Sequence, residues 1–524
     1  MSYQYKIEDN KAFLIDSNNV LQETNLPKLF HNDKLDEEFN IVESEIRETI
    51  LVGTFSTSQT QRFGKNKKGN IIYFVKPLNL KLPGFMVSYG GKTKGKLIIR
   101  FKFIEWKNKL PLGQIIDVIG ESNNENLERI LMFHHNIFPR ISKYKGNNMK
   151  IDRVELDLDI FSIDPENCTD IDDAMSIENK NGDTIIGIHI AQPIAFLSLS
   201  DIKNKIENQF STLYLNNTRK DLWGKDITDK SSLFENEKRL AYSTFFHYKD
   251  SKLINTEDFA SVIINKKNLN YDNANRYFPA KNLLNFTREL SEIEDYHDLV
   301  SYWMIKTNNY IGLKLKDYIP FRVNQQNEKE CSIDDLPKDI GKKLISKKIE
   351  GAYYSFEKIK HETLDLEYYC HFTSPIRRIM DSWIHYILTY DKSPSNEIDL
   401  KTINILDKKT KKFHREIELN SVINKIFKEE TTINRTGYIT EIISNNLIEV
   451  YIEELGFLKV KLYSLIFDYL LEKENNFEVL TLKYKNEEYL YKTGSKIELI
   501  ISKVDSILPK NKLVIKPKDA ISFI

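Results

Sequence analysis

Four aspartates lie within ten residues in the stretch FSIDPENCTDIDDAMSIE at 161–178. They are Asp164, Asp170, Asp172 and Asp173. Pro165 and the Asn and Thr residues after it favour a loop over a helix interior. Like charges this close are costly unless cations neutralise them, and carboxylate oxygens suit hard ions, Mg²⁺ above all. Two such ions about 4 Å apart would activate a water and stabilise the leaving oxygen in phosphodiester cleavage.

The spacing excludes an EF-hand, because the glycine at the sixth position and the glutamate at the twelfth do not follow. A solvated acidic loop, or aspartates that only cap turns, stays open as an alternative.

A second motif lies about 200 residues later, in CHFTSPIRRIMDSWIHYILTY at 370–390. Thr373 and Ser374 are good N-cap residues, and Pro375 fits the first helical position. We therefore expect Arg377 and Arg378 in the first turn of a helix, where a basic side chain works against the macrodipole. A helix N-terminus with arginine forks would suit a phosphate. A pair of surface arginines beside core histidines, His371 and His385, is the alternative.

The formal net charge of the chain is zero, with 76 Lys and Arg against 76 Asp and Glu, which taken alone argues against a nucleic-acid partner. The charges are segregated, however. Residues 1–48 carry eleven acids and five bases, whereas residues 49–104 carry eleven bases and no acid. Aromatic residues and runs such as IIYFV alternate there as in β-strands. A small basic barrel with exposed aromatics is typical of OB-type modules that bind single strands, although a merely solvated charged face has the same pattern.

Four segments follow from these patterns. Residues 1–48 are an acidic lead-in, interpreted as a reduced cold-shock-type remnant, and residues 49–145 are the OB-type barrel. Residues 146–430 are a large mixed α/β body, with strands such as TIIGIHIA followed by long helices. Residues 431–524 return to β-patterning and predict a second OB-type barrel. The predicted fold class is α+β, with OB-type barrels flanking the body that carries both motifs.

The composition of the chain indicates the compartment in which the protein works. The three cysteines, Cys168, Cys331 and Cys370, are far apart and form no C-x-x-C, which excludes a disulfide framework or zinc ribbon and suits a reducing compartment. No apolar run approaches the roughly 18 residues of a membrane span. The first residues do not resemble a targeting signal. We expect a cytoplasmic location and no membrane partner.

Both motifs resemble those of the RNase II/RNase R superfamily of 3′→5′ exoribonucleases. Ile163-Asp164-Pro165 and the run from Cys168 to Ala174 are similar to the family's aspartate signature, and Ile188-His189-Ile190-Ala191 to its following strand. The run from His371 to Arg378, with Asp381 and His385, resembles the second signature. Leu269-Asn270-Tyr271 resembles a shorter motif between them. One departure is Ser301, where the family usually has an acid.

The resemblance implies site residues. The four aspartates would hold two Mg²⁺ ions, for which Mn²⁺ could substitute, and Arg377 or Arg378 would contact the scissile phosphate. Tyr271 would stack on the terminal base, and His371, Thr373 and Ser374 would join the arginines in binding RNA. The implied activity is processive hydrolysis of single-stranded RNA to nucleoside 5′-monophosphates. The alternative is a catalytically weak or inactive RNA-binding homologue that acts as an RNA-processing scaffold.

The resemblance also implies a partner and a state of assembly. The partner would be single-stranded RNA, and the protein would be a monomer, with membership of a larger RNA-decay complex left open. A metal-dependent enzyme acting on DNA or small esters fits the aspartates but not the flanking barrels.

Overall fold

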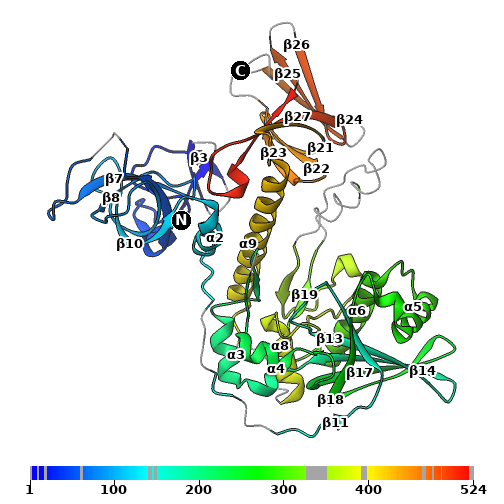
Figure 1. The fold of residues 1–524 in the computed structure, drawn as a ribbon. Coiled ribbons are helices and arrows are strands. Elements are labelled where there is room, and N and C mark those ends of the chain that lie inside the picture. Colours follow the sequence, from blue (N-terminus) through cyan, green and yellow to red (C-terminus); the bar gives the residue numbers. More distant parts are fainter. Residues whose placement is uncertain are drawn as a thin grey trace. The chain divides into compact units, whose positions relative to one another are not determined.

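The structure, a computed structural model, describes residues 3–8, 11–16, 20–59, 63–139, 144–146, 150–216, 218–325, 341, 351–390, 398–462, 468–474, 477–484 and 487–518. Cys331 lies outside these residues. The chain has the predicted α+β class, with mixed α/β structure and a closed β-barrel (Figure 1). No helix among the described residues is both long and apolar enough to cross a membrane.

The chain divides into two compact units. One comprises Met1–Ile137, Arg415–Arg435 and Glu498–Ser522, and the other comprises Phe138–His414, Thr436–Ile497 and Phe523–Ile524. The four consecutive segments predicted from the sequence stay a prediction.

The N-terminal segment of the first unit is a five-stranded sheet with strand order β3-β2-β1-β4-β5. Its strands are β1 (Tyr3–Glu8), β2 (Lys11–Ile15), β3 (Leu21–Glu23), β4 (Lys34–Leu35) and β5 (Ile41–Glu43). Tyr5, Leu14, Leu29 and Leu35 form a small core of its own. The acidic lead-in therefore contains folded β-structure, and its assignment as a cold-shock-type remnant stays a prediction.

A closed barrel with strand order β10-β8-β7-β6-β9 follows, which confirms the small β-barrel expected from the basic segment. Its strands are β6 (Ile50–Ser56), β7 (Ile71–Pro77), β8 (Phe85–Tyr89), β9 (Lys96–Glu105) and β10 (Leu112–Glu121). The short helix α1 (Glu45–Glu48) precedes the barrel, and α2 (Leu127–His134) follows it. Ten of the eleven lysines and arginines counted in 49–104 are described, and nine of these, all the lysines, are exposed.

The aromatic residues of the barrel do not form the exposed surface that the sequence suggested. Tyr73, Phe85 and Phe101 are buried in the barrel core, while Phe74 and Tyr89 are half-buried. In a barrel this small, inward-facing positions need large side chains to fill the interior, so alternate aromatics turn inward. The prediction of exposed aromatics is therefore wrong, whereas the basic side chains are exposed as predicted.

The second unit is built on a six-stranded sheet with the order β11-β18-β12-β13-β14-β17. The strands are β11 (Val154–Glu155), β12 (Ile160–Asp164), β13 (Asp173–Lys180), β14 (Asp183–Ala191), β17 (Lys238–Lys249) and β18 (Lys252–Asn270). Two short two-stranded sheets accompany it: β15 (Leu213–Tyr214) with β16 (Arg219–Lys220), and β19 (Phe321–Val323) with β20 (Tyr353–Ser355).

Two tight turns fix the register of this sheet. Asn181 and Gly182 both have positive φ, of 55° and 85°, as expected for the Asn-Gly hairpin turn whose twist matches that of its strands. This turn pairs Asp173 with Ile190. Asp250 and Ser251 make the corresponding turn between β17 and β18. A one-residue slip would move every side chain to the other face, so the turns determine where Asp173 points.

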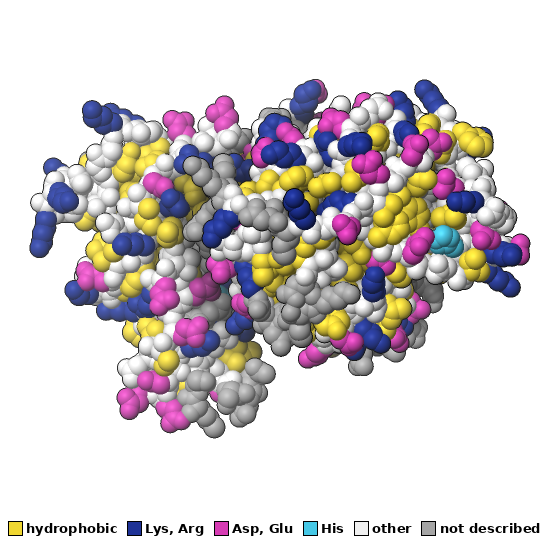
Figure 2. Space-filling view, turned by 90° about the horizontal axis from the view of Figure 1, so that it is seen from below, with side chains coloured by type: hydrophobic (Ala, Val, Ile, Leu, Met, Phe, Trp, Pro, Cys, Tyr) yellow, Lys and Arg dark blue, Asp and Glu magenta, His cyan; other side chains and the backbone are white. Residues whose placement is uncertain are grey.

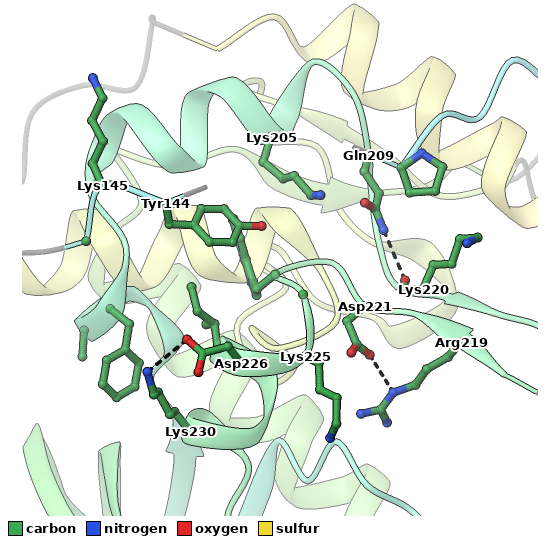
Figure 3. Close-up of a pocket in the computed structure, with 17 residues that line it drawn as sticks. Tyr144, Lys145, Lys205, Gln209, Arg219, Lys220, Asp221, Lys225, Asp226 and Lys230 are labelled. Carbon is green, nitrogen blue, oxygen red and sulfur yellow. Dashed lines mark hydrogen bonds and ion pairs between the residues drawn. The ribbon is translucent and has the colours of Figure 1, made fainter. Parts of the chain in front are cut away.

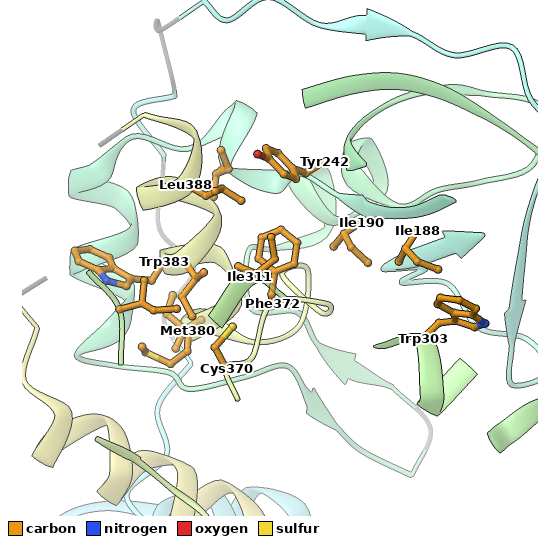
Figure 4. Packing of buried hydrophobic residues seen from close by; sticks show 14 of the residues in the cluster. Ile188, Ile190, Tyr242, Trp303, Ile311, Cys370, Phe372, Met380, Trp383 and Leu388 are labelled. Carbon is orange, nitrogen blue, oxygen red and sulfur yellow. The ribbon is translucent and has the colours of Figure 1, made fainter. Parts of the chain in front are cut away.

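Helices pack on the sheet around a large apolar core. They are α3 (Leu199–Ile206), α4 (Lys225–Ser231), α5 (Phe278–Leu290), α6 (Tyr296–Lys314) and α8 (Ile379–Thr389). Figure 4 shows side chains of α6 (Trp303 and Ile311), of α8 (Met380, Trp383 and Leu388) and of β14 within one cluster. The sequence pattern also predicts long helices at 297–318 and 406–430, and the structure confirms them as α6 and α9 (Leu400–Ile426).

The C-terminal part is β-rich, as the pattern of 431–524 predicted. In the second unit β21 (Thr432–Ser444), β22 (Leu447–Ile452) and β23 (Gly456–Lys461) form an antiparallel meander, as do β24 (Asp468–Glu474), β25 (Phe477–Tyr484) and β26 (Glu487–Lys492). β27 (Lys496–Lys503) pairs with β28 (Leu513–Pro517). The strands match the prediction, and a C-terminal domain bounded at 431–524 stays a prediction.

Candidate active site

The aspartate loop connects two neighbouring strands. β12 ends at Asp164 and β13 begins at Asp173, so the loop prediction is confirmed. Two backbone hydrogen bonds hold it in place, from the Ala191 N–H to the Asp172 carbonyl (2.8 Å) and from the Leu233 N–H to the Ile171 carbonyl (3.1 Å). The sheet therefore fixes the far end of the loop, just before Asp173.

Asp170 is held by two side chains that the sequence analysis missed. The Tyr214 hydroxyl donates to one carboxylate oxygen at 2.6 Å, and the Arg219 guanidinium contacts the other at 2.6 Å. Both residues come from the small β15–β16 hairpin, about 50 positions after the loop. No spacing in the sequence relates a tyrosine and an arginine in YLNNTR to an aspartate loop, because tertiary structure alone brings them together.

Asp172 is buried, with 2% of its surface exposed, and is paired with the second motif. The Ile376 N–H donates to one carboxylate oxygen at 2.7 Å, and Arg377 Nε donates to the other at 3.0 Å. Burial raises the pKa of Asp172 to about 7, although Arg377 acts in the opposite direction. The two motifs, 200 residues apart, thus meet in one ion pair.

Asp164 and Asp173 form no ion pair with a described residue, in contrast to Asp170 and Asp172. Oδ2 of Asp164 is buried and has no hydrogen-bond partner among the described residues. Burial raises the pKa of Asp164 to about 6. Burial, followed by the charges of Asp164 and Asp172, raises the pKa of Asp173 well above its usual value. The alternative of a solvated acidic loop is therefore wrong: the loop is held at several points and its carboxylates influence one another.

The second motif departs from its predicted helix start. α8 begins at Ile379, with Arg378 as its N-cap residue, so Arg377 and Arg378 precede the helix. Residues 375–377 instead form a separate turn, in which the Arg378 N–H donates to the Ser374 carbonyl at 2.9 Å. Beyond this turn the Ile379 N–H donates to the Phe210 carbonyl, and the Thr212 N–H donates to the Arg377 carbonyl, both at 3.0 Å. The prediction of arginines in the first helical turn is wrong, because pairing with residues 210–212 interrupts the helical hydrogen bonds and leaves Arg378 extended.

The two arginines are used differently. The Arg377 side chain lies against Asp172 and is 47% exposed, whereas that of Arg378 is 23% exposed and donates to Asp381 at 2.8 Å. Asp381 is fully buried and also accepts the Ser374 N–H at 2.8 Å. Arg377 therefore presents its guanidinium at the aspartates, and Arg378 locks the turn in front of α8.

Thr373 and Ser374 are 3% and 4% exposed. Asn308 of α6 accepts the Phe372 and Thr373 N–H groups through its side-chain oxygen, at 2.8 and 3.2 Å. Ser374 Oγ accepts from Arg377 at 3.1 Å. Such burial argues against the expected direct RNA contacts of Thr373 and Ser374 and makes them positioning residues for Arg377.

The two histidines of the second motif, His371 and His385, contact aromatic side chains. The half-buried His371 ring is hydrogen-bonded to the Tyr354 hydroxyl at 2.7 Å. The His385 ring stacks on Phe372, with centroids 3.8 Å apart, and burial lowers the pKa of His385 to about 3. His385 is therefore a neutral histidine in the core. The alternative interpretation of the second motif, in which its histidines are core residues, is confirmed for His385.

Tyr271 follows the last residue of β18, Asn270, which pairs with Asp164 at the end of β12. Burial, together with the charges of Asp173 and Asp164, raises the pKa of Tyr271 to about 12, which places the ring near those aspartates. His297 of α6 stacks on one face, with ring centroids 3.5 Å apart at 14°. The histidine fixes the tyrosine ring and leaves at most one face for a base.

The carboxylate oxygens of the aspartate loop are the kind of ligand that a hard divalent cation prefers. Burial raises the pKa values of Asp164 and Asp173, and Oδ2 of Asp164 has no hydrogen-bond partner among the described residues, so a cation at this point would stabilise both carboxylates. Among the described residues, however, no three His, Cys, Asp or Glu side chains are grouped closely enough to hold a metal ion. Arg219 and Arg377 hold Asp170 and Asp172 instead, so these two carboxylates would have to exchange arginine for metal.

We expect the Asp164→Asn variant to be more stable than the wild type at pH 8 in EDTA. Because the folded-state pKa of Asp164 is raised to about 6, the unfolded chain loses this proton first, and stability falls as pH rises from the unfolded value to about 6. Above that pH the full penalty, about 3 kcal/mol, is present. Asparagine removes it and should raise Tm at pH 8 by roughly 5 °C.

At pH 5 the wild-type carboxyl is protonated in the folded state, so the gain in Tm should shrink. Thermal unfolding at both pH values measures this. An equal change in Tm at pH 5 and pH 8 would show that Asp164 is not the titrating group.

Comparisons with known proteins are in line with this geometry. Residues 154–293 and 281–390 match the RNB domain. Ribonuclease R of Mycoplasmopsis pulmonis is 23% identical over 452 residues, which cover 68% of this chain and 62% of that protein. The chain spans about half to three-fifths of the length of the curated relatives it matches.

Solved structures share the fold. The apo form of Mycoplasma genitalium RNase R has a TM-score of 0.75 at 17% identity, over 99% of this chain and 100% of the other. Yeast Ssd1, described as a pseudonuclease, has a TM-score of 0.69 at 12% identity, over 99% of this chain and 96% of the other.

Proposed function

Because residues 154–390 match the RNB domain and the fold is shared with an RNase R, we propose that the chain is a member of the RNase II/RNase R superfamily and a processive, hydrolytic 3′→5′ exoribonuclease. It degrades single-stranded RNA and releases nucleoside 5′-monophosphates. The observation that carries this proposal is the meeting of the two motifs, in which Arg377 lies 3.0 Å from the buried Asp172, beside three further aspartates.

In the proposed reaction a water oxygen attacks the last phosphodiester phosphorus. The bond from phosphorus to the 3′-oxygen of the preceding nucleotide breaks, and that oxygen leaves with a proton as a new 3′-hydroxyl. Arg377 is the residue we assign to the scissile phosphate, since its guanidinium is accessible while that of Arg378 is directed to Asp381. A guanidinium placed next to phosphate oxygens that gain negative charge during the reaction stabilises the transition state.

Asp164, Asp170, Asp172 and Asp173 would hold the divalent cations, two Mg²⁺ ions or Mn²⁺ in their place. When bound, such ions supply an activated water and neutralise charge on the phosphate and leaving oxygen. Before the ions bind, Arg219 and Tyr214 keep Asp170 in place, and Arg377 keeps Asp172 in place. These contacts would keep the loop in its conformation when its carboxylates bind no metal.

The partner is single-stranded RNA, guided by the exposed lysines of the basic barrel. The net charge is zero, and Figure 2 shows Lys and Arg side chains interspersed with Asp and Glu on the face in view. We therefore propose that attraction for RNA is local and does not come from the net charge of the chain. We propose a monomer in the reducing cytoplasm, where Cys168 and Cys370 stay free thiols, and leave membership of an RNA-decay complex open.

The second candidate function is an RNA-binding scaffold with little or no catalysis. Two observations favour it: arginines already occupy Asp170 and Asp172, and the fold is shared with a pseudonuclease. Ser301, at the position where the family usually has an acid, lies exposed on α6 and adds no carboxylate.

Incubation of the protein with single-stranded RNA labelled at the 5′ end, in Mg²⁺ or EDTA, separates the two functions. In Mg²⁺ we expect full-length RNA to be replaced by a short 5′-labelled end product with few intermediates, as a processive enzyme produces, and in EDTA we expect intact RNA. When the 3′-terminal nucleotide carries the label, labelled 5′-monophosphates should appear. Unchanged RNA mobility in every lane, together with RNA binding, would instead support the scaffold. Equal digestion of matched DNA would contradict the RNA assignment.

Replacing Tyr271 by alanine is expected to weaken binding of a short single-stranded RNA by about 10- to 100-fold, because stacking of one base on an aromatic ring is worth roughly 1–3 kcal/mol. Tyr271→Phe keeps the ring and its contact with His297 and should bind like wild type. Fluorescence anisotropy of a labelled tetranucleotide in EDTA measures both. Wild-type affinity of the alanine variant would remove Tyr271 from the RNA site.

A further inference from the structure

Arg219 forms ion pairs with two carboxylates of the second unit. Its Nη1 contacts Asp170 of the aspartate loop at 2.6 Å, and its Nε contacts Asp221 at 2.6 Å. Its Nη2 donates to the Thr169 carbonyl at 3.3 Å. Figure 3 shows the pair with Asp221 as a dashed line. The same guanidinium therefore contacts one of the four loop aspartates and a carboxylate outside the loop.

The β15–β16 hairpin places Arg219 against the loop. Tyr214 and Arg219 are paired directly across this hairpin, so their side chains lie on the same face and both reach Asp170. The base of the hairpin is anchored, because the Thr212 N–H donates to the Arg377 carbonyl at 3.0 Å. A change of partner at Arg219 therefore requires rotation of its side chain and no movement of the hairpin.

The carboxylates of the loop differ in what a cation would have to displace. Both oxygens of Asp170 have partners, Arg219 on one and the Tyr214 hydroxyl on the other. Oδ2 of Asp164 has no hydrogen-bond partner among the described residues. A divalent cation at Asp164 would meet an unpaired oxygen. One at Asp170 would have to displace a guanidinium, which stays protonated in proteins and competes as a cation.

Asp221 keeps the charge of Arg219 compensated when the contact with Asp170 is broken. The Asp221 side chain is 11% exposed, and it contacts Nε of Arg219, whereas Asp170 contacts Nη1. Arg219 and Asp221 also line a cavity of about 1000 Å³ that none of the four loop aspartates lines (Figure 3). The guanidinium can therefore turn into this cavity and stay paired with Asp221, which avoids leaving a buried charge without a partner.

We propose that Arg219 is a displaceable counter-ion, which competes with a divalent cation for Asp170 and stays bound to Asp221 when the cation displaces it. The inference rests on the proposed function, since it concerns the cation requirement of the same site. The loop binds a first divalent cation readily and a second one only at a concentration high enough to displace Arg219. Arg219 is thus a positioning residue that sets the divalent-cation concentration at which the site is complete.

Electron paramagnetic resonance of free Mn²⁺, recorded while MnCl₂ is titrated into the full chain without RNA, tests the proposal. For the wild type we expect two classes of bound Mn²⁺. The second class should be about 10- to 100-fold weaker, because Asp170 is free of Arg219 in only a small fraction of molecules. In Arg219→Gln this second class should tighten by about tenfold or more, since glutamine carries no competing charge.

Lys220→Gln is the matched control. Lys220 is the neighbour of Arg219 on β16, and its side chain is exposed. The change removes the same charge from the same strand but leaves the contact between Arg219 and Asp170 in place. Its Mn²⁺ affinities should stay within about twofold of the wild type at physiological salt, because exposed charges are screened. Tightening as large as that of Arg219→Gln would show a general charge effect and overturn the proposal.

Asp221→Asn should have the opposite effect to Arg219→Gln. Without Asp221, release of Arg219 from Asp170 leaves the guanidinium unpaired, so the second class of Mn²⁺ should weaken by about tenfold. Asparagine has the same shape as aspartate, which favours a folded variant. If Arg219→Gln does not fold, this measurement decides, and an unchanged Mn²⁺ affinity of Asp221→Asn would overturn the proposal.

Thermal unfolding in EDTA and in excess Mn²⁺ checks the fold of each variant and gives a second readout. Arg219→Gln should lower Tm in EDTA, where Asp170 loses its counter-ion. The loss should be smaller in Mn²⁺, because the cation replaces the guanidinium and binds only the folded chain tightly. An equal drop in Tm under both conditions would mean that Arg219 only supports the loop, contrary to the proposal.

The outcomes separate this proposal from the proposed function. Arg219→Gln that binds Mn²⁺ with wild-type affinity, or more weakly, would overturn the role of Arg219 and leave the proposed hydrolysis intact. Absence of Mn²⁺ binding in the wild type and in every variant would overturn both. Digestion of single-stranded RNA by the wild type in Mg²⁺, measured in parallel, reports on the proposed function alone.

Discussion

Asp172→Asn is expected to lower kcat for RNA hydrolysis by about 10³-fold, because a carboxylate that holds a catalytic cation contributes several kcal/mol to the transition state and each 1.36 kcal/mol is tenfold in rate. Asparagine has the same shape, and its oxygen can still accept the Ile376 N–H that the wild type binds at 2.7 Å. The loop should therefore stay in place, and RNA affinity measured in EDTA should remain close to that of the wild type.

Asp157→Asn is the matched control. Asp157 lies before the loop, its side chain is exposed, and its ion-pair partner among the described residues is Lys266, at 3.1 Å. Single-turnover digestion of 5′-labelled RNA in Mg²⁺ compares the two variants. Undiminished digestion by Asp172→Asn would contradict the assignment of the loop as the catalytic centre, and loss of digestion in both would point to a general defect.

Arg377→Ala is expected to lower kcat by about 10²–10³-fold, the usual cost of removing one donor aimed at developing charge in the transition state. Arg377→Lys should recover part of this loss, since lysine supplies charge without a planar fork. Stability should change little in comparison, because the Arg377 side chain is 47% exposed and Asp172, with a pKa of about 7, can take up a proton when its partner is lost.

Arg378→Ala should mainly lower stability, whereas Arg377→Ala should mainly lower kcat. Its removal leaves the fully buried Asp381 without its arginine, and breaking a buried ion pair costs about 3–5 kcal/mol. A clear drop in Tm should therefore accompany Arg378→Ala but not Arg377→Ala. If kcat per folded molecule falls more in Arg378→Ala, then Arg378 rather than Arg377 contacts the phosphate.

The sequence identified the elements well where the pattern was local. The long helix α6, the strand β14 and the basic barrel were all predicted from the sequence pattern, and the structure contains each of them. Predictions failed where backbone groups found partners far along the chain. Arg377 lies in a separate turn before α8, because its carbonyl accepts the Thr212 N–H and the Ile379 N–H donates to Phe210 instead of continuing the turn that begins at Ser374.

Burial was the second feature that the sequence could not provide. The aromatics of the barrel looked suited to stacking on bases, yet Tyr73, Phe85 and Phe101 fill the barrel core. Thr373 and Ser374 looked accessible at a helix start, yet Asn308 and Arg377 are their neighbours inside the protein. Residue type indicated what each side chain can do, while packing decided whether a ligand can reach it.

By itself the sequence determined which chemical groups this protein has, namely four clustered carboxylates and two adjacent arginines, and the local elements that carry them. Only the tertiary structure decided their partners: Arg377 for Asp172, Arg219 and Tyr214 for Asp170, and Asp381 for Arg378. The physical reason is that charge interactions depend on distance in space and on exclusion of water, and neither quantity follows from separation along the chain.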